Sequence, residues 1–105
     1  MRLAESLSLA MRALPGVEQG RSRFGKAGHL AWSVNGREFA HLHADDLLDL
    51  RLPRAKQSEL REDPRAHFRG SRSEWLEFEF HSEQDVAELM LLASEAWAAT
   101  KEYTK

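Results

Sequence analysis

Amphipathic periodicity near both ends of the chain predicts two long helices. The first is indicated by apolar residues at helical spacing, which are Leu3, Leu7, Ala10, Met11 and Leu14. Because proline cannot donate a helical hydrogen bond and glycine favours a turn, Pro15-Gly16 ends this helix, which we expect over 3–13. The last helix, expected over 83–100, follows a capping-box-like start at Ser82 and has an apolar stripe formed by Val86, Leu89, Met90, Ala93, Ala96 and Trp97.

Between these helices the pattern predicts strands joined by short connections. The expected strands are a short one within 17–24, then 30–34, 37–43, 47–52, 66–69 and 75–80. Pro53 begins a polar helix that Asp63-Pro64 ends, and this helix must be peripheral because only Ala55 and Leu60 are apolar. We therefore expect one α+β domain over 1–105, a two-layer, mainly antiparallel sheet of about five to six strands with the N- and C-terminal helices on one face.

The Asn35-Gly36 dipeptide fixes the expected register of the central hairpin, because it is typical of a two-residue turn. The expected pairs are Val34 with Arg37, Trp32 with Phe39, Leu30 with His41, and Gly28 with His43. A three-residue connection over 44–46 then sets His43 against Leu47, His41 against Asp49 and Phe39 against Arg51. We reject a two-residue loop there, because it would place Asp49 and Arg51 among the helices, where unpaired charges are costly.

This register gives the sheet one face covered by helices and one open face. The covered face is expected to hold Leu42, Leu48, Leu50, Leu52, Leu76, Phe78 and Phe80, with small Ala31 and Ala40 letting the helices approach. The candidate ligand or partner face consists of Trp32, Phe39, His41, His43, Asp49, Arg51 and Trp75, beside Glu77 and Glu79. Aromatic rings with convergent polar groups suit a ligand site or an interface. The alternative is a partly solvated face that is covered by loops or by a second copy of the chain, as in a homodimer.

Two chemical hypotheses concern the histidines of this face. His41 and His43 alternate on one strand and are followed by Asp45 and Asp46, so they are candidate metal ligands. A histidine with Asp49 could also supply the base of a small hydrolase, although no motif marks a nucleophile. The chain has no cysteine and no nucleotide-binding fingerprint, and we infer no cofactor.

Charge and composition bear on partners and location. Residues 21–72 carry 11 Lys/Arg against 7 Asp/Glu, whereas 73–105 carry 2 against 8. Candidate nucleic-acid contacts are Arg21, Arg23, Lys26, Arg65, Arg69 and Arg72, although the net charge of -2 does not favour this partner. No apolar run is long enough to span a membrane, and Glu5 in the first amphipathic segment argues against a signal peptide. We expect a soluble, cytoplasmic, bacterial-type protein.

Several segments resemble the small bacterial proteins called the luciferase domain family, a group of unknown function. The likeness rests on GREFAHLH (36–43), DLRLP (49–53), DPR (63–65) and SEWLEF (73–78), and extends over roughly 14–98. The resemblance implies a signature on His43, Asp49, Arg51, Pro53 and Trp75, most of which lie on the expected open face. It implies no flavin chemistry, because flavin-dependent luciferases are much larger barrels. The layout is also loosely similar to the YjbR/MmcQ group, often labelled DNA-binding.

The leading hypothesis from the sequence is a non-enzymatic binding or interaction module that uses the open sheet face for a small ligand or a protein partner. The first alternative is a hydrolase-like or metal-assisted enzyme that uses His41, His43 and Asp49. The second is a DNA-binding accessory protein that uses the arginines named above.

Overall fold

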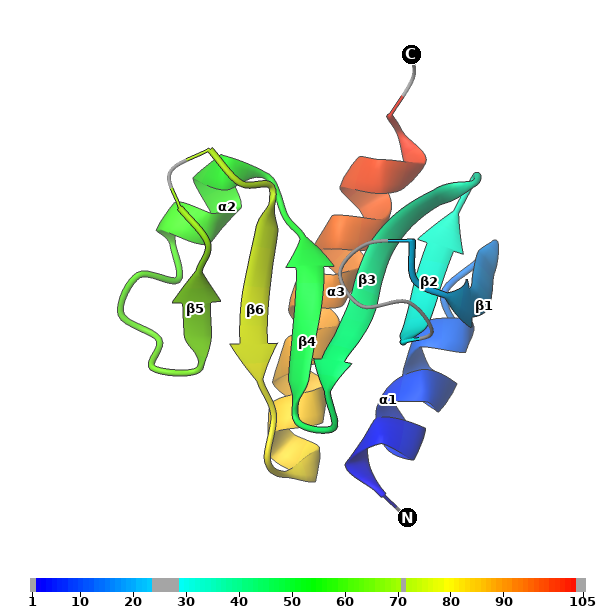
Figure 1. Cartoon of the computed structure of the whole chain (residues 1–105), viewed down its shortest axis with the longest axis horizontal. Coiled ribbons are helices and arrows are strands. Elements are labelled where there is room, and N and C mark those ends of the chain that lie inside the picture. The colour runs from blue at the N-terminus through cyan, green and yellow to red at the C-terminus, as the bar shows by residue number, and fades with distance from the viewer. Residues whose placement is uncertain (1, 24–28, 71, 104–105) are drawn as a thin grey trace.

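An antiparallel sheet of six strands has two long helices packed on one face in the computed structural model, which describes residues 2–23, 29–70 and 72–103 (Figure 1). The strands are β1 (Val17–Arg21), β2 (Leu30–Val34), β3 (Arg37–Ala44), β4 (Leu47–Arg51), β5 (Ala66–Phe68) and β6 (Trp75–Glu79), in the spatial order β1-β2-β3-β4-β6-β5. The helices are α1 (Leu3–Arg12), α2 (Arg54–Ser58) and α3 (Glu83–Lys101). The expected α+β architecture is confirmed, although α2 ends at Ser58, before the expected end at Asp63-Pro64.

The helices begin and end where their local chemistry requires it. The Glu5 carboxylate accepts a hydrogen bond from the backbone N–H of Arg2 at the start of α1, and Gly16 turns the chain with φ of +75° after its end. The Ser82 hydroxyl caps α3 by accepting from the backbone N–H of Asp85. None of the helices in the described ranges is long and apolar enough to cross a membrane.

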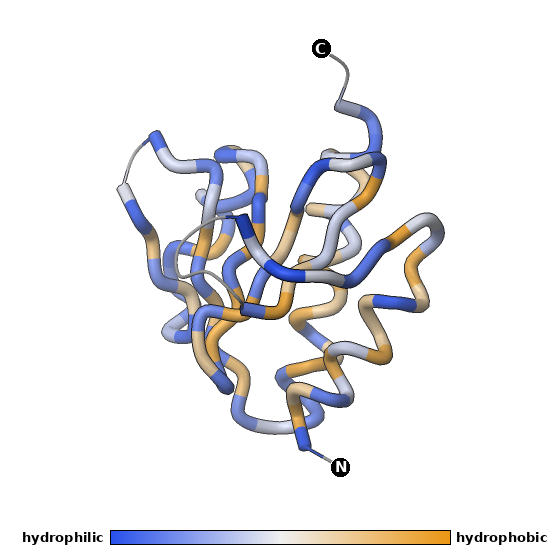
Figure 2. The backbone as a smooth tube through the Cα atoms, turned by 45° about the vertical axis from the view of Figure 1, so that its right-hand side comes forward, coloured by the Kyte–Doolittle hydropathy of each residue, from blue (hydrophilic) through white to orange (hydrophobic). Residues whose placement is uncertain are grey.

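The core lies between the sheet and the two long helices. Alternating hydrophobic and hydrophilic positions can be followed along the tube in Figure 2. Leu48, Leu50 and Phe78 are buried from the sheet side, and Leu89 is buried from α3, as expected. Trp97 is only half-buried against this core, and its indole N–H donates to the carbonyl of Pro15 at 3.0 Å. It therefore ties the end of α3 to the turn after α1.

The turn between β2 and β3 is the expected one. Asn35 and Gly36 have φ of +53° and +76°, as a two-residue turn of this type requires. Val34 pairs with Arg37 as predicted. Beyond this pair a β-bulge at Glu38 and Phe39 shifts the register of the two strands by one residue.

The bulge moves Trp32 to the face covered by the helices. Trp32 pairs with Ala40 rather than with Phe39, and its indole N–H donates to Gln19 Oε1, which also accepts from the Ser8 hydroxyl of α1. Trp32 and Phe39 both have no exposed surface and belong to the hydrophobic core. Their predicted place on an open aromatic face is therefore wrong.

The same shift moves Ala31 to the open face. Ala31 of β2 pairs with His41, so the prediction that Leu30 pairs with His41 is wrong. The predicted place of Ala31 under the helices is wrong for the same reason. The predicted partner of His43, Gly28, lies outside the described residues.

A second bulge lies in the connection between β3 and β4. Ala44 pairs with Leu47, so the turn has two residues, Asp45 and Asp46, rather than the expected three. His43 is the additional residue of this bulge and does not pair with Leu47. The bulge restores the register beyond the turn, so the predicted pair of His41 with Asp49 is confirmed.

Candidate functional site

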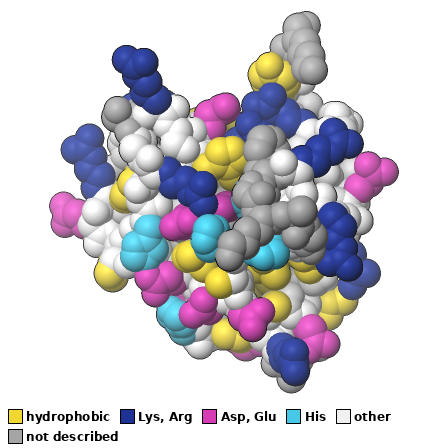
Figure 3. All heavy atoms as spheres, viewed as in Figure 1, with side chains coloured by type: hydrophobic (Ala, Val, Ile, Leu, Met, Phe, Trp, Pro, Cys, Tyr) yellow, Lys and Arg dark blue, Asp and Glu magenta, His cyan; other side chains and the backbone are white. Residues whose placement is uncertain are grey.

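A row of polar side chains crosses the open face of the sheet. His41 of β3, Asp49 of β4, Glu77 of β6 and His67 of β5 are successive cross-strand partners. Cross-strand partners project from the same face, so these groups lie side by side. In Figure 3 histidine and acidic side chains gather across the middle of this face.

His41 is held between two buried carboxylates. Its Nδ1 lies 2.8 Å from Glu38 Oε2, and its Nε2 lies 2.8 Å from Asp49 Oδ2. The side chains of His41, Glu38 and Asp49 are only 6%, 7% and 0% exposed. The Trp75 ring packs over the imidazole at 4.8 Å between centroids. Both nitrogens of His41 thus face carboxylates inside the protein, which leaves this ring poorly placed to contact a ligand.

The first bulge explains how Glu38 reaches His41. In a regular strand, residues three apart project from opposite faces, but one additional residue between them puts both on the same face. The Ser22 hydroxyl donates to Glu38 Oε2 at 2.8 Å, and the Arg23 backbone N–H donates to Glu38 Oε1 at 3.1 Å. The sequence analysis missed Glu38, because only the bulge brings its carboxylate to this face.

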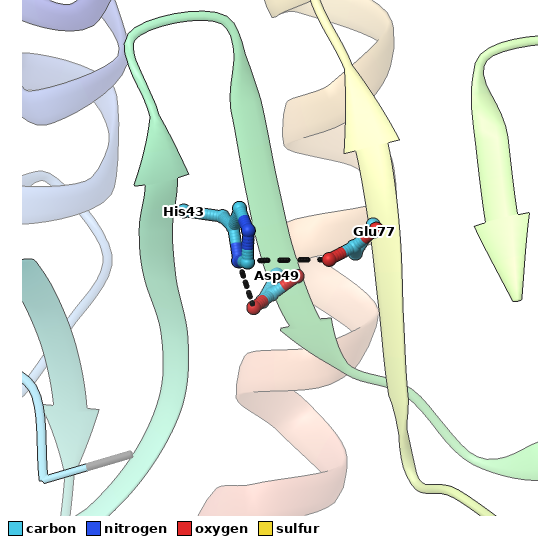
Figure 4. Close-up of side chains that lie close together, drawn as sticks. All are labelled: His43, Asp49 and Glu77. Carbon is cyan, nitrogen blue, oxygen red and sulfur yellow. Dashed lines mark ion pairs between the residues drawn. The ribbon is translucent and has the colours of Figure 1, made fainter. Parts of the chain in front are cut away.

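The second bulge presents His43 at the surface. Its Nδ1 lies 3.6 Å from Asp49 Oδ2 and 3.5 Å from Glu77 Oε2 (Figure 4). One nitrogen of the Arg69 guanidinium, Nη2, donates to both carboxylates, at 2.9 Å and 2.8 Å, and lies 3.4 Å from the same His43 nitrogen. His43 is half-exposed, Asp49 is fully buried, and Arg69 is the cation that joins them.

His43, Asp49 and Glu77 are a group that could hold a metal ion in the described part of the chain, with ligand atoms all within 4.8 Å of one another. His43 thus remains a candidate metal ligand, whereas both nitrogens of His41 contact the carboxylates of Glu38 and Asp49. A cavity of about 240 Å³ lies beside His43, with His29, Leu30 and Asp45 among its lining residues.

A second, exposed histidine group lies nearer the β5 edge. Glu79 Oε1 is 2.9 Å from His81 Nε2, and Glu79 Oε2 pairs with His67 Nε2. The hydrogen bonds from His81 and then His67 lower the pKa of Glu79, and the Glu79 carboxylate raises the pKa of His81. This group is separate from the contacts of His43.

Two arginines lie near the end of the sheet that carries the β2–β3 turn. Arg51 Nε donates to the backbone carbonyl of Glu38 at 2.9 Å, and its guanidinium lies over the Trp75 ring at 4.6 Å. Arg37 lies over the Tyr103 ring at 3.7 Å. Burial, and then the charge of Arg37, lower the pKa of Arg51.

These arginines line a cavity of about 690 Å³ at the junction of the β2–β3 hairpin and the end of α3. Its lining includes Arg21, Arg23, Arg37, Arg51, Thr100 and Tyr103. The sequence analysis missed Arg37, Thr100 and Tyr103, because the hairpin and the last turn of α3 meet only in the folded chain.

The other candidate nucleic-acid contacts are dispersed. Arg65 pairs with Asp63, Asp85 and Glu88 at 3.0, 2.7 and 2.8 Å, and Arg69 pairs with carboxylates of the open face. Lys26 lies outside the described residues, and Arg72 is exposed after β5. Paired guanidinium groups are poorly placed to neutralise phosphates.

Comparison with known proteins gives one match. A family model described as "Luciferase domain" matches residues 36–96, a span that contains His41, His43, Asp49, Arg69 and Glu77. No curated protein and no solved structure matches the chain. The looser likeness to the YjbR/MmcQ group is not confirmed.

Proposed function

This chain belongs to the Luciferase domain family, and we propose that it is a binding module that takes a small anionic molecule into the arginine-lined cavity. The observation that carries this proposal is the meeting of two half-buried guanidinium groups, Arg37 and Arg51, at a cavity of about 690 Å³. A cavity of that size is within the usual range for small-molecule sites.

The charges around the cavity favour an anion. Its lining has four arginines and two glutamates, Glu18 and Glu38, which leaves an excess of two positive charges. The Glu38 carboxylate is already engaged by His41, by the Ser22 hydroxyl and by a backbone N–H. The lining therefore has more guanidinium groups than carboxylates, which favours positive potential in the cavity.

Arg37 and Arg51 also lie close enough to repel each other. Glu74 contacts both arginines, at 3.5 Å and 3.6 Å, and its side chain is 59% exposed, so water weakens both contacts. An oxyanion bound between the two guanidinium groups would offset their repulsion and accept charge-assisted hydrogen bonds.

Two buried polar atoms beside the cavity support the same ligand class. Arg37 Nε and Thr100 Oγ1 are buried and have no hydrogen-bond partner among the described residues. Buried polar atoms are normally hydrogen-bonded, so a ligand oxygen that enters the cavity can satisfy them after a side-chain rotation. The Tyr103 ring, half-exposed at the same cavity, offers contact area for an apolar part of the ligand.

The test is isothermal titration calorimetry with inorganic phosphate, citrate and AMP as probes. We expect at least one probe to bind, and Arg37→Gln and Arg51→Gln each to weaken its binding about tenfold or more, because each removes a charge-assisted contact of roughly 1.5–3 kcal/mol. Arg54→Gln is the matched control, because Arg54 is exposed on α2 and does not line this cavity.

Binding that survives both cavity substitutions would refute the proposed site. Failure of the wild-type protein to bind any of the three anions would refute the proposed ligand class. Salt-dependent binding to random duplex DNA, lost in Arg23→Gln and Arg72→Gln, would favour the nucleic-acid alternative instead.

A further inference from the structure

We propose that His43, Asp49 and Glu77 bind a divalent transition-metal ion, and that the Arg69 guanidinium is an internal cation that the metal displaces. The site lies at a different part of the open face from the arginine-lined cavity and does not depend on the anion proposal.

The spacing of the ligand atoms suits a metal. His43 Nδ1 lies 3.6 Å from Asp49 Oδ2 and 3.5 Å from Glu77 Oε2, and all three atoms lie within 4.8 Å of one another. In a tetrahedral zinc site with bonds near 2.1 Å, neighbouring ligand atoms are about 3.4 Å apart. Small side-chain movements would therefore complete three of the four positions.

The donor set defines the class of ion. One imidazole nitrogen and two carboxylate oxygens are ligands that Zn²⁺ and related first-row ions accept. The His43 side chain is 50% exposed and that of Glu77 is 20% exposed, so water can reach the fourth position.

Asp49 provides a second observation in favour of a ligand. Its side chain is completely buried, yet Oδ1 has no hydrogen-bond partner among the described residues. An unsatisfied oxygen on a buried carboxylate is costly, and a cation bound by both oxygens of Asp49 would offset that cost. Behind it, His41 contacts Asp49 Oδ2 and is itself held by Glu38, an arrangement that orients metal-binding carboxylates in other proteins.

Arg69 occupies the position that a metal would take. Its Nη2 atom lies 2.9 Å from Asp49 Oδ2, 2.8 Å from Glu77 Oε2 and 3.4 Å from His43 Nδ1, the three atoms of the proposed ligand set. Arg69 lies just outside β5, its side chain is 39% exposed, and Gly70 after it has φ of +126°. The guanidinium can therefore move into solvent while the three ligands stay on their strands.

If the metal ion and the Arg69 guanidinium compete for the same three atoms, removal of Arg69 should strengthen metal binding. We expect wild-type protein to bind one Zn²⁺, and Arg69→Gln to bind it about tenfold more tightly. His43→Ala and Glu77→Gln should each remove most of the binding. Titration calorimetry with Zn²⁺, beside thermal melts that confirm folding, measures all four proteins. Arg69→Ala is the second variant if the glutamine variant fails to fold.

Two matched controls separate this site from its neighbours. His81→Ala, which alters the exposed group around Glu79, should leave Zn²⁺ binding unchanged. Arg37→Gln should also leave it unchanged, so failure of the anion proposal and failure of the metal proposal are distinguishable. The metal proposal is overturned if Arg69→Gln and Arg69→Ala fold but bind Zn²⁺ no more tightly than wild type. It is equally overturned if His81→Ala loses the binding while His43→Ala keeps it.

Discussion

Two histidines that are two positions apart in the sequence have different environments in the folded chain. His41 is enclosed by Glu38, Asp49 and Trp75, whereas His43 is half-exposed beside Arg69. Alternation along a strand places both on one face, but burial depends on the two bulges that flank His41. The residue type alone therefore does not distinguish a buried structural histidine from an exposed histidine that can bind a ligand.

Replacement of each histidine by alanine should therefore have unequal effects on stability. His41→Ala leaves two buried carboxylates without their shared partner and should reduce the free energy of unfolding by about 3–5 kcal/mol. His43→Ala removes a half-exposed ring and should cost less than about 1 kcal/mol. Urea denaturation of the two variants measures the difference, and equal losses would contradict the assignment of His41 to the structure.

At the scale of elements, the hairpins could be predicted from the sequence but not their bulges. Asn35-Gly36 predicts the turn and its first pair because the dipeptide favours positive φ. Nothing in the local pattern indicates that Phe39 is an additional residue. The bulge is stabilised by contacts between residues far apart in the sequence, because the shifted register buries Trp32 in the core and turns the Glu38 carboxylate toward His41. The last helix and its Ser82 cap were predictable because both signals are local.

The shifted register predicts that Trp32 belongs to the core. Trp32→Ala should reduce the free energy of unfolding by about 3–5 kcal/mol, because it leaves a large cavity in the core. Trp32→Phe should cost less, since it keeps a ring and loses mainly the hydrogen bond to Gln19. Acrylamide quenching of a variant that retains Trp32 as its single tryptophan provides a second measurement. Efficient quenching, or an unchanged unfolding midpoint in Trp32→Ala, would contradict the burial of Trp32 and favour the predicted register without a bulge.

At the scale of the whole molecule, the fold interleaves two oppositely charged parts of the chain. The basic segment 21–72 supplies Arg65 and Arg69 together with two of their partners, Asp63 and Asp49. The acidic segment 73–105 supplies the other partners, which are Glu77, Asp85 and Glu88. The sequence shows the charge difference between the segments but not this neutralisation, which depends on β5 and β6 being neighbours. At the large cavity, Arg37 and Arg51 meet Glu74 of the same acidic segment at 3.5 Å and 3.6 Å, and the exposure of Glu74 weakens both contacts.

Arg65 is one of the residues that join these two parts of the molecule, because it pairs with Asp63 before β5 and with Asp85 and Glu88 of α3. Hydrogen bonds from Arg65 lower the pKa of Asp63, while the backbone N–H of His81 and then Arg65 lower that of Asp85. Carboxylates with lowered pKa stabilise the fold above their ordinary values, about 4, and lose that contribution as the pH falls through the lower folded-state values.

Arg65→Met should therefore lower the melting temperature at pH 7, and its difference from wild type should shrink as the pH falls below about 4. High salt should also reduce the difference, because these groups are partly exposed. Thermal melts across pH and salt measure both trends. A difference that is the same at pH 3 and pH 7 would show that Arg65 acts through packing of its stem rather than through its charge.

The central claim, that the cavity beside Arg37 and Arg51 receives a small anion, is tested most directly by NMR titration of labelled protein with citrate or phosphate. We predict saturable shifts of the Nε–H signals of Arg37 and Arg51 and of the backbone amides of Thr100 and Tyr103, with little change at Arg54 on α2. Shifts confined to other parts of the surface, or no saturable shift at millimolar anion, would contradict the claim.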